Sequence, residues 1–238
     1  FRIEYYRSYK VVTVPAPFPG GEPQVYLLVQ CGAPVPDDVV ADQVIMVPVR
    51  SVVTTSTTFL TALDELGVLD RLVGLDEATY VSNPHVLEMV AAGQLTMIGV
   101  GAGVAVEQAI DLQPDLIMTV AAGNVDFDAY PPLREAGLPV VLNAEWLESS
   151  PLGRAEWSKF IATFFNREAA AEALFAQRMA RYNELAALAA DTPTRPTVFV
   201  NLAARGLWSV PGGNSYIARF LADAGADYLW ASDTSNER

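Results

Sequence analysis

Hydrophobic and polar positions change their spacing along the chain, and each change marks a different kind of element. From residue 2 to about residue 49, apolar residues alternate with polar ones or form short β-branched runs, at residues 11–14 and 25–29. The turn signal Pro-Gly-Gly-Glu at residues 19–22 separates these two runs. Two alternating runs joined by a turn are typical of paired β-strands, so this part is predicted to form a β-hairpin.

Short apolar runs then alternate with segments at helical spacing. Phe59, Leu63 and Leu66 share one face of a helix that Gly67 ends. Strands are expected near residues 51–53, 72–75, 96–98, 116–120 and 139–142, and further helices over residues 84–92, 106–112 and 130–136. Strands and helices that alternate through short loops form a parallel sheet covered by helices. Ligands bind such sheets at the carboxyl ends of the strands.

The spacing changes again over residues 154–191, where nearly every residue is a good helix former. This stretch is too long for an ordinary crossover helix, and Asn166 is expected to be the N-cap of a second helical segment. A second α/β unit follows, with strands near residues 197–201 and 228–231, a turn and short strand at 206–211, and a helix over 216–224. The predicted organisation is therefore a β-hairpin extension (1–48), an α/β lobe (49–144), a linker helix region (145–191) and the start of a second α/β lobe (192–238).

Composition excludes several classes of protein. A chain of 238 residues that is 51% hydrophobic and 18% charged buries a core and does not remain disordered. Its net charge of −13 argues against nucleic acid and against an anionic membrane surface, because both partners require an excess of Lys and Arg. The sequence contains no apolar run long enough to span a membrane, and Phe1 does not begin a signal segment.

Metal coordination by the protein itself is not expected. Cys31 is the single cysteine, which rules out an intramolecular disulfide, and His85 is the single histidine. An enzyme is also disfavoured, because the sequence has no Gly-x-Ser-x-Gly elbow and no phosphate-binding Gly-x-x-x-x-Gly-Lys loop. Loop carboxylates such as Asp126 and Asp128 remain the alternative for acid–base chemistry, although such groups are usually solvated. No catalytic residue is assigned.

Three blocks of the sequence resemble the periplasmic substrate-binding proteins of ABC importers for ferric siderophores and cobalamin. The first is the strand and helix at residues 50–74, and the second is VEQAIDLQPDLI at residues 106–117. The third is WSVPGGNSYIARFLADAG at residues 208–225. The three blocks together, in this order, are specific, and the resemblance covers roughly residues 44–233.

The resemblance implies two Rossmann-like lobes joined by one long rigid helix, with the ligand held in the cleft between them. The ligand class is a ferric siderophore, a corrinoid or haem, in which an organic chelator already holds the Fe or Co, so no directly bound cofactor is expected. The partner is an ABC permease, and the expected protein is a periplasmic or extracellular monomer, with a lipid anchor left open. Members of the family continue further, so the second lobe is expected to be incomplete in this chain.

Ten residues are candidate ligand contacts. They lie at predicted strand ends, in loops, or at the edge of the implied cleft: Thr55, Ser56, Thr57, Gly103, Asn124, Glu145, Trp146, Arg205, Trp208 and Asn214. Hydroxyl groups at a helix start suit an anionic or carbonyl-bearing ligand, and an arginine beside an indole suits an anionic chelate or a planar ring. Plain helix capping, turn chemistry and anchoring of the linker helix by tryptophans are the alternatives.

Two acidic residues are candidates for docking to the permease. In the resembling family, an acidic residue on each lobe pairs with permease arginines, and Asp76 or Glu77 lies in the corresponding region of the first lobe. A solvated loop charge is the alternative. A further hypothesis is an interaction or sensor module on the same fold, in which the N-terminal hairpin would be the docking element.

Overall fold

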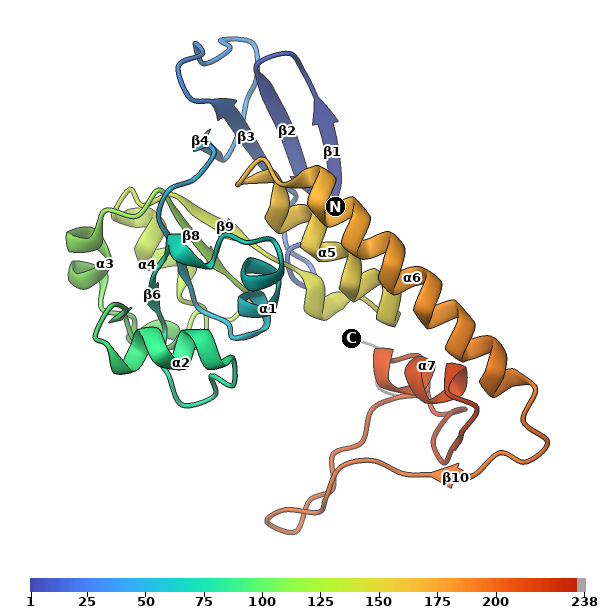
Figure 1. Ribbon diagram of the computed structural model, residues 1–238. Helices are drawn as coiled ribbons and strands as arrows, with labels where there is room; N and C mark the ends of the chain where they lie inside the picture. Colours follow the sequence, from blue (N-terminus) through green and yellow to red (C-terminus); the bar gives the residue numbers. More distant parts are fainter. Residues whose placement is uncertain (235–238) are drawn as a thin grey trace. The chain divides into compact units, whose positions relative to one another are not determined.

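The computed structural model describes residues 1–234, which divide into two compact units. Unit 1 contains Phe1–Ala144 and Ser158–Ala171, and unit 2 contains Glu145–Trp157 together with the described residues from Glu172 onward. The protein has a mixed α/β architecture, as predicted, and Figure 1 labels most of its helices and strands, numbered in chain order. Among the described residues, no helix combines the length and the apolar character needed to cross a bilayer.

The N-terminal part of unit 1 is a sheet of four strands (Figure 1). The strands are β1 (Arg2–Tyr5), β2 (Tyr9–Val14), β3 (Gln24–Gln30) and β4 (Gln43–Val47), in that spatial order. The predicted hairpin corresponds to the antiparallel pair β2 and β3, but β4 adds to it in parallel to β3. Turn signals do not reveal such a parallel partner, because its pairing is made through a crossover and not through a tight turn.

The central sheet of unit 1 has five strands, all parallel. They are β5 (Val52–Thr54), β6 (Leu72–Leu75), β7 (Thr96–Met97), β8 (Leu116–Thr119) and β9 (Val140–Leu142), and their spatial order is β7-β6-β5-β8-β9. The chain builds outward from β5 to β7 and then returns to add β8 on the other side of β5. The carboxyl ends of β5 and β8 are therefore the topological switch point of the sheet, where open α/β sheets bind their ligands.

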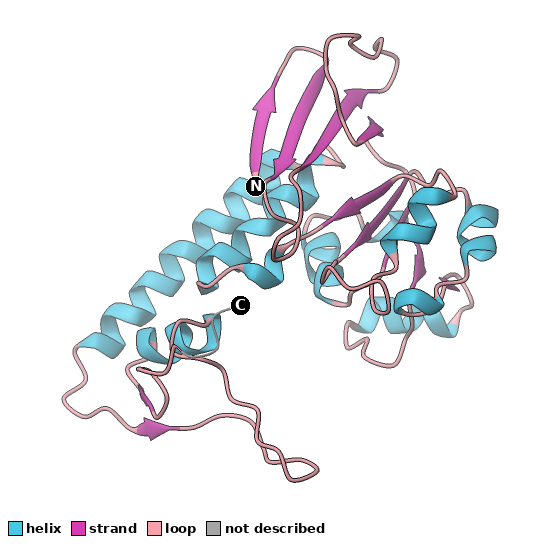
Figure 2. Ribbon diagram, turned by 180° about the vertical axis from the view of Figure 1, so that it is seen from behind, coloured by secondary structure: helices cyan, strands magenta, loops and turns pink. Residues whose placement is uncertain are grey.

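Helices pack around this sheet, as the cyan ribbons beside the magenta strands in Figure 2 show. They are α1 (Thr58–Glu65), α2 (Pro84–Ala91), α3 (Val106–Leu112) and α4 (Tyr130–Glu135), with short 3₁₀ turns η1 (Leu69–Arg71) and η2 (Gly101–Gly103). The helices α3 and α4 cover one sheet face, because Ala109 and Leu133 share a buried cluster with Val53, Ile117 and Val140. The apolar face predicted for α1 is buried through Phe59, Leu60 and Leu63.

The long helical region consists of α5 (Pro151–Thr163) and α6 (Glu168–Ala190). The prediction that Asn166 is the N-cap of the second helix is wrong. Asn166 has a φ of 54°, in the left-handed region that typically follows the end of a helix, whereas an N-cap residue is usually extended. The carbonyl of Arg167 accepts the amide hydrogen bond from Ala171 and so begins α6.

The N-terminal sheet holds the corner between these two helices within unit 1. The ammonium of Lys10, which is only 4% exposed, donates to the carbonyl of Thr163 (2.8 Å) and to Oδ1 of Asn166 (2.7 Å), and it pairs with Glu168. The side-chain amides of Gln30 and Asn166 exchange two hydrogen bonds, of 3.2 and 2.8 Å. The extension is therefore part of the core of unit 1.

Unit 2 contains a small βαβ arrangement. Strands β10 (Thr197–Val198) and β11 (Asp227–Tyr228) pair in parallel, and α7 (Tyr216–Asp223) lies between them in sequence. Both strands are shorter than predicted. In place of the short strand expected at residues 206–211, Ala204 and Leu207 form an isolated bridge around a turn in which Arg205 and Gly206 have positive φ.

Candidate ligand-binding site

Two threonine hydroxyls meet at the switch point of the central sheet. Thr55, the residue after β5, donates through Oγ1 to Oγ1 of Thr119 at 2.5 Å, and the Thr119 hydroxyl donates to the carbonyl of Val120 at 3.1 Å. Thr119 is buried and Thr55 is half-buried. The parallel register of β5 and β8 brings the two strand ends together, so this hydroxyl pair depends on the fold and not on closeness in sequence.

The neighbouring hydroxyls serve the start of α1. The Ser56 hydroxyl lies 2.8 Å from that of Thr58 and accepts a hydrogen bond from the Thr58 amide at 3.3 Å. Thr57 occupies the N-cap position, with helical backbone angles and no capping bond from its side chain. Of the three predicted hydroxyls, Thr55 is therefore the one that the structure joins to a second strand end.

Asp76 follows β6 at the same edge of the sheet. Its amide donates to the carbonyl of Thr54 (3.2 Å), and its own carbonyl accepts from the amide of Gly99 (3.0 Å). Its Oδ1 is buried and has no hydrogen-bond partner among the described residues, and burial raises the pKa of this carboxyl. The adjacent Glu77 accepts a hydrogen bond from the Thr79 hydroxyl at 2.8 Å. Of the two predicted docking residues, Asp76 is thus the one built into the strand edge.

Two further loops complete this edge. Gly103 ends the η2 turn, and the loop at residues 120–129, which follows β8, carries Asn124. The buried carboxylate of Asp128 accepts hydrogen bonds from the amides of Ala122, Gly123 and Asn124 at 2.7, 2.9 and 3.0 Å. The Asp128 carboxylate is therefore fully engaged in holding its own loop, and it is not the solvated group expected from the sequence.

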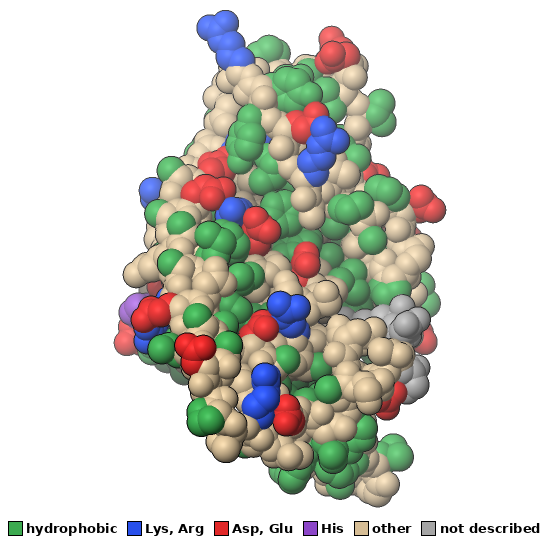
Figure 3. Space-filling view, turned by 90° about the vertical axis from the view of Figure 1, so that its right-hand side faces the viewer, with side chains coloured by type: hydrophobic (Ala, Val, Ile, Leu, Met, Phe, Trp, Pro, Cys, Tyr) green, Lys and Arg blue, Asp and Glu red, His purple; other side chains and the backbone are tan. Residues whose placement is uncertain are grey.

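Exposed hydrophobic side chains border the same edge of unit 1. They lie in the loops that follow β6, β7 and β8 and are between 54% and 77% exposed: Tyr80, Val100, Val125 and Phe127. We call these four residues the apolar rim. Figure 3, which views another side of the molecule, shows exposed hydrophobic side chains there too, interspersed with charged ones. A group of exposed apolar side chains beside partly buried polar groups is typical of small-molecule sites.

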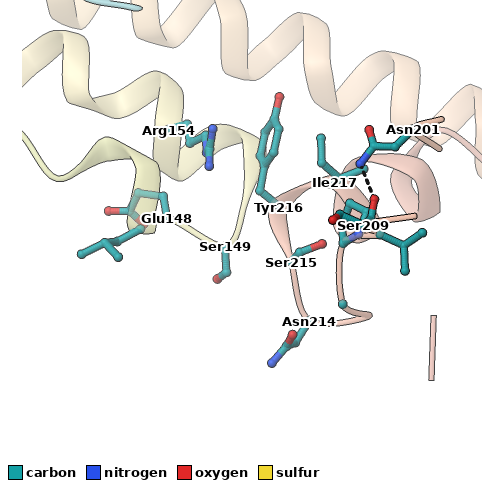
Figure 4. A pocket seen from close by; sticks show the side chains of 13 residues that line it. Glu148, Ser149, Arg154, Asn201, Ser209, Asn214, Ser215, Tyr216 and Ile217 are labelled. Carbon is teal, nitrogen blue, oxygen red and sulfur yellow. Dashed lines mark hydrogen bonds between the residues drawn. The ribbon is translucent and has the colours of Figure 1, made fainter. Parts of the chain in front are cut away.

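Unit 2 contains a pocket of about 580 Å³. It is formed by two segments of the chain, residues 147–154 and residues 201–217 (Figure 4). Polar lining residues are Glu148, Ser149, Arg154, Asn201, Ser209, Asn214, Ser215 and Tyr216. The guanidinium of Arg154 lies 4.2 Å from the centre of the Tyr216 ring, and Arg154 donates to the carbonyl of Trp146 at 3.0 Å. This arginine is therefore held in place beside an aromatic face.

The predicted ligand contacts that belong to unit 2 do not all line this pocket. Asn214 lines the pocket, whereas Glu145 and Trp146 lie in the turn η3 (Glu145–Leu147) outside its lining. Arg205 lies in the turn beside Gly206. The indole of Trp208 donates to the carbonyl of Val200 (3.2 Å).

Trp208 also belongs to an aromatic cluster. Its ring packs against Phe199 and Trp230, with ring centres 5.5 and 5.1 Å away. Neither Arg205 nor Trp208 is among the lining residues of the pocket, and Trp208 contributes to the packing of unit 2.

Several polar residues at these places were not among the candidates from the sequence. Thr119 ends an apolar run and is indistinguishable from an ordinary strand residue until β8 is paired with β5. Ser209 and Tyr216 line the pocket of unit 2, and the sequence signal for Tyr216 is its position directly after the N-cap Ser215.

Comparison with known proteins gives a family for most of the chain. Residues 52–238 match the periplasmic binding protein family. An uncharacterized lipoprotein of Methanocaldococcus jannaschii is 26% identical over 197 residues, which cover 79% of this chain. The chain spans about half the length of this curated relative, since the match covers 47% of it.

Solved structures share the fold. The periplasmic heme-binding protein RhuT of Roseiflexus sp. RS-1 superposes with a TM-score of 0.59 at 24% identity, and the match covers 77% of this chain and 66% of that protein. A structure of an ABC-type Fe³⁺-hydroxamate transport system from Saccharomonospora viridis gives a TM-score of 0.59 at 17% identity, with 80% and 67% of the two chains covered.

Proposed function

Because this chain belongs to the periplasmic binding protein family, we propose that it binds a chelated metal and delivers it to an ABC importer. The ligand class is a ferric siderophore, a corrinoid or haem. Support comes from two proteins of the same fold, one a heme-binding protein and the other part of an Fe³⁺-hydroxamate transport system. The lipoprotein relative supports a location outside the cytoplasmic membrane. We propose no catalytic step.

The observation that carries the proposal is the hydroxyl pair of Thr55 and Thr119 at the switch point of the parallel sheet. These hydroxyls lie at the strand edge that also carries Asp76 and the apolar rim. Hydroxyls can bond the polar atoms of a chelate, and the rim can cover a large apolar face of it. The metal is then held by the donor atoms of the chelator, and the protein recognises the chelate as an organic molecule.

The pocket of unit 2 suits the same class of ligand. Arg154 supplies a guanidinium for a carboxylate or another anionic group, and Tyr216 supplies an aromatic face. Side chains of Asn214, Ser209 and Ser149 add hydrogen-bonding groups. We propose that Asp76 or Glu77 docks on the permease. The hydrogen bond between Glu77 and Thr79 lies at the surface, since Thr79 is exposed, so the Glu77 carboxylate is the more accessible of the two to a partner protein.

Ligand binding is tested by titrating the intrinsic tryptophan fluorescence of the protein with a ferric hydroxamate, a ferric catecholate, cyanocobalamin and haemin. We expect saturable quenching by one class of ligand. The variant Thr55→Val keeps the shape of the side chain but removes the hydroxyl, and it is expected to weaken that binding by about tenfold, the scale of one hydrogen bond.

The matched control is Thr61→Val, which removes an exposed hydroxyl on α1 and is expected to leave the affinity unchanged. A folded protein that responds to none of the four ligands would contradict the proposed ligand class. Equal affinities for wild type and Thr55→Val would contradict the assignment of the switch point as the binding edge.

A further inference from the structure

The loop between β2 and β3 brings an aromatic ring from the N-terminal sheet to the carboxyl edge of the central sheet. The ring of Phe18 is enclosed by two glycines. A Cβ atom on Gly123 would lie 2.8 Å from Cδ2 of Phe18, and a Cβ atom on Gly21 would lie 2.8 Å from Cε2 of the same ring. Phe18 also lies near Tyr130 at the start of α4, with ring centres 6.4 Å apart.

This contact falls on the loop at residues 120–129. Gly123 has a φ of 76°, which favours glycine, so both its backbone conformation and the nearby ring require a residue without a side chain. On its inner side, the loop is held by the Asp128 carboxylate through the amides of residues 122–124. Phe18 therefore packs on the one turn of this loop that Asp128 also fixes.

We propose that Phe18 is a positioning residue for the ligand, and this proposal rests on the proposed function. It acts through Gly123 to hold the loop that carries Asn124, Val125 and Phe127, of which the last two belong to the apolar rim. Phe18 lies outside the part of the chain that matches the family, residues 52–238. The N-terminal sheet thus contributes a positioning residue to the binding edge.

The physical basis is preorganisation. A glycine at positive φ loses much conformational freedom when a loop is ordered, and the packed ring restricts the conformations of Gly123 before the ligand arrives. Without the ring, the loop can adopt other conformations, so ordering the rim becomes a cost of binding. Such a cost reduces affinity mainly through faster dissociation.

The first test measures the loop without any ligand. In Phe18→Ala, amide hydrogen exchange of residues 122–124 is expected to rise on the order of tenfold, while exchange in β5 and β8 stays at the wild-type rate. Phe18→Leu, which keeps an apolar side chain, is expected to restore most of the protection. The control is Tyr6→Ala, which removes another aromatic ring of the N-terminal region, one stacked on Tyr9 with ring centres 4.5 Å apart. Unchanged exchange at residues 122–124 in Phe18→Ala, or an equal rise throughout unit 1, would overturn the proposal.

The second test measures the ligand from the four-compound panel that wild type binds. Phe18→Ala is expected to raise the dissociation rate constant about tenfold, Phe18→Leu to recover it, and Tyr6→Ala to match wild type. If wild type binds and Phe18→Ala dissociates at the same rate, the role in ligand binding is wrong although the proposed function stands. If wild type binds none of the four, the proposed function fails, and hydrogen exchange alone decides whether Phe18 positions the loop.

Discussion

Two buried charges in unit 1 show how this chain satisfies ionised groups away from water. The ammonium of Lys10 has three donors, and all three find acceptors, on Thr163, Asn166 and Glu168. The carboxylate of Asp128 accepts three backbone amides. A buried charge is tolerated only when its hydrogen-bonding capacity is used in this way, so each of these residues fixes the segment that supplies its partners.

Lys10→Met tests the first of these charges. The substitution keeps an unbranched side chain but removes the Lys10 donor from the Glu168 carboxylate and the Thr163 carbonyl, and it leaves Asn166 Oδ1 with the Gln30 amide alone. We therefore expect a loss of about 3 kcal/mol in unfolding free energy. Urea denaturation followed by circular dichroism measures it. Arg2→Met, which removes an exposed partner of Glu4, is the control and should cost less than about 1 kcal/mol. Equal, small losses in both variants would mean that Lys10 does not fix the helix corner.

The raised pKa of the Asp76 carboxyl predicts that the stability of the protein depends on pH. Burial raises the pKa of its carboxyl in the folded protein, so the folded state retains the proton at pH values where the unfolded chain has lost it. Its contribution to stability is therefore fully present below the unfolded pKa, about 3.9, and is lost as the pH rises through the folded pKa. Asp76→Asn is expected to melt at a higher temperature than wild type at neutral pH and to match it near pH 4.

Thermal melts of both proteins across this pH range measure the effect. Asp70→Asn, at an exposed carboxylate, provides the control. A difference between wild type and Asp76→Asn that does not change with pH would show that the amide acts through something other than the charge.

At the scale of elements, the bounds of single helices and strands could be predicted from the sequence, whereas the pairing between distant segments could not. The predicted bounds of α3 (Val106–Leu112) and β6 (Leu72–Leu75) agree with the structure, because side-chain periodicity and the flanking turn residues are written in the nearby sequence. The parallel addition of β4 and the left-handed Asn166 depend on contacts with residues far along the chain. Sequence patterns of a single segment contain no information on such partners.

The same limit applies to the candidate site. Thr55 was predictable as a hydroxyl between a strand and a helix, and Asn214 as a polar residue before α7. Their neighbours Thr119 and Tyr216 come into position through strand pairing and through a cation–π contact with Arg154. The sequence therefore indicated where to look along the chain, and the fold identified which side chains lie together.

Helix α7 offers a test at this scale. The Ser215 hydroxyl accepts a hydrogen bond from the Ala218 amide at 3.2 Å, so Ser215→Ala should cost about 1 kcal/mol of stability. Ser215→Asp, which preserves a capping oxygen, should restore it, and urea denaturation of the two variants measures both effects. A loss of the same size in Ser215→Asp would show that the hydroxyl acts through the packing of the pocket and not through the cap.

At the scale of the whole molecule, the N-terminal sheet is predicted to be required for the fold of unit 1. Its residues bond or pack on the central sheet and on α5, since the Tyr26 hydroxyl accepts from the Leu142 amide (2.8 Å) and the Tyr26 ring packs on Phe160. Deleting residues 1–49 would expose buried side chains such as Phe160 and Phe164. We expect the deleted protein to lose cooperative thermal unfolding.

Differential scanning calorimetry measures this loss. Deletion of residues 1–5, which removes the edge strand β1 and the Phe1 ring that packs on Phe160 but keeps β2, β3 and β4, is the milder comparison and should retain cooperative unfolding. The hypothesis of a detachable docking module expects the opposite result. In that case the protein without residues 1–49 would retain a sharp transition and its ligand, and the sheet would be an addition to an independent fold.

The division of the chain into units has a consequence for how such proteins can diversify. Residues 158–171 belong to unit 1, but the stretches before and after them, Glu145–Trp157 and the residues from Glu172 onward, belong to unit 2. A single genetic crossover exchanges one continuous end of a gene, so it cannot replace one unit without also replacing part of the other. A chimaera made by one crossover would therefore combine residues of both parents within at least one unit, and the contacts inside that unit would join segments from two different proteins.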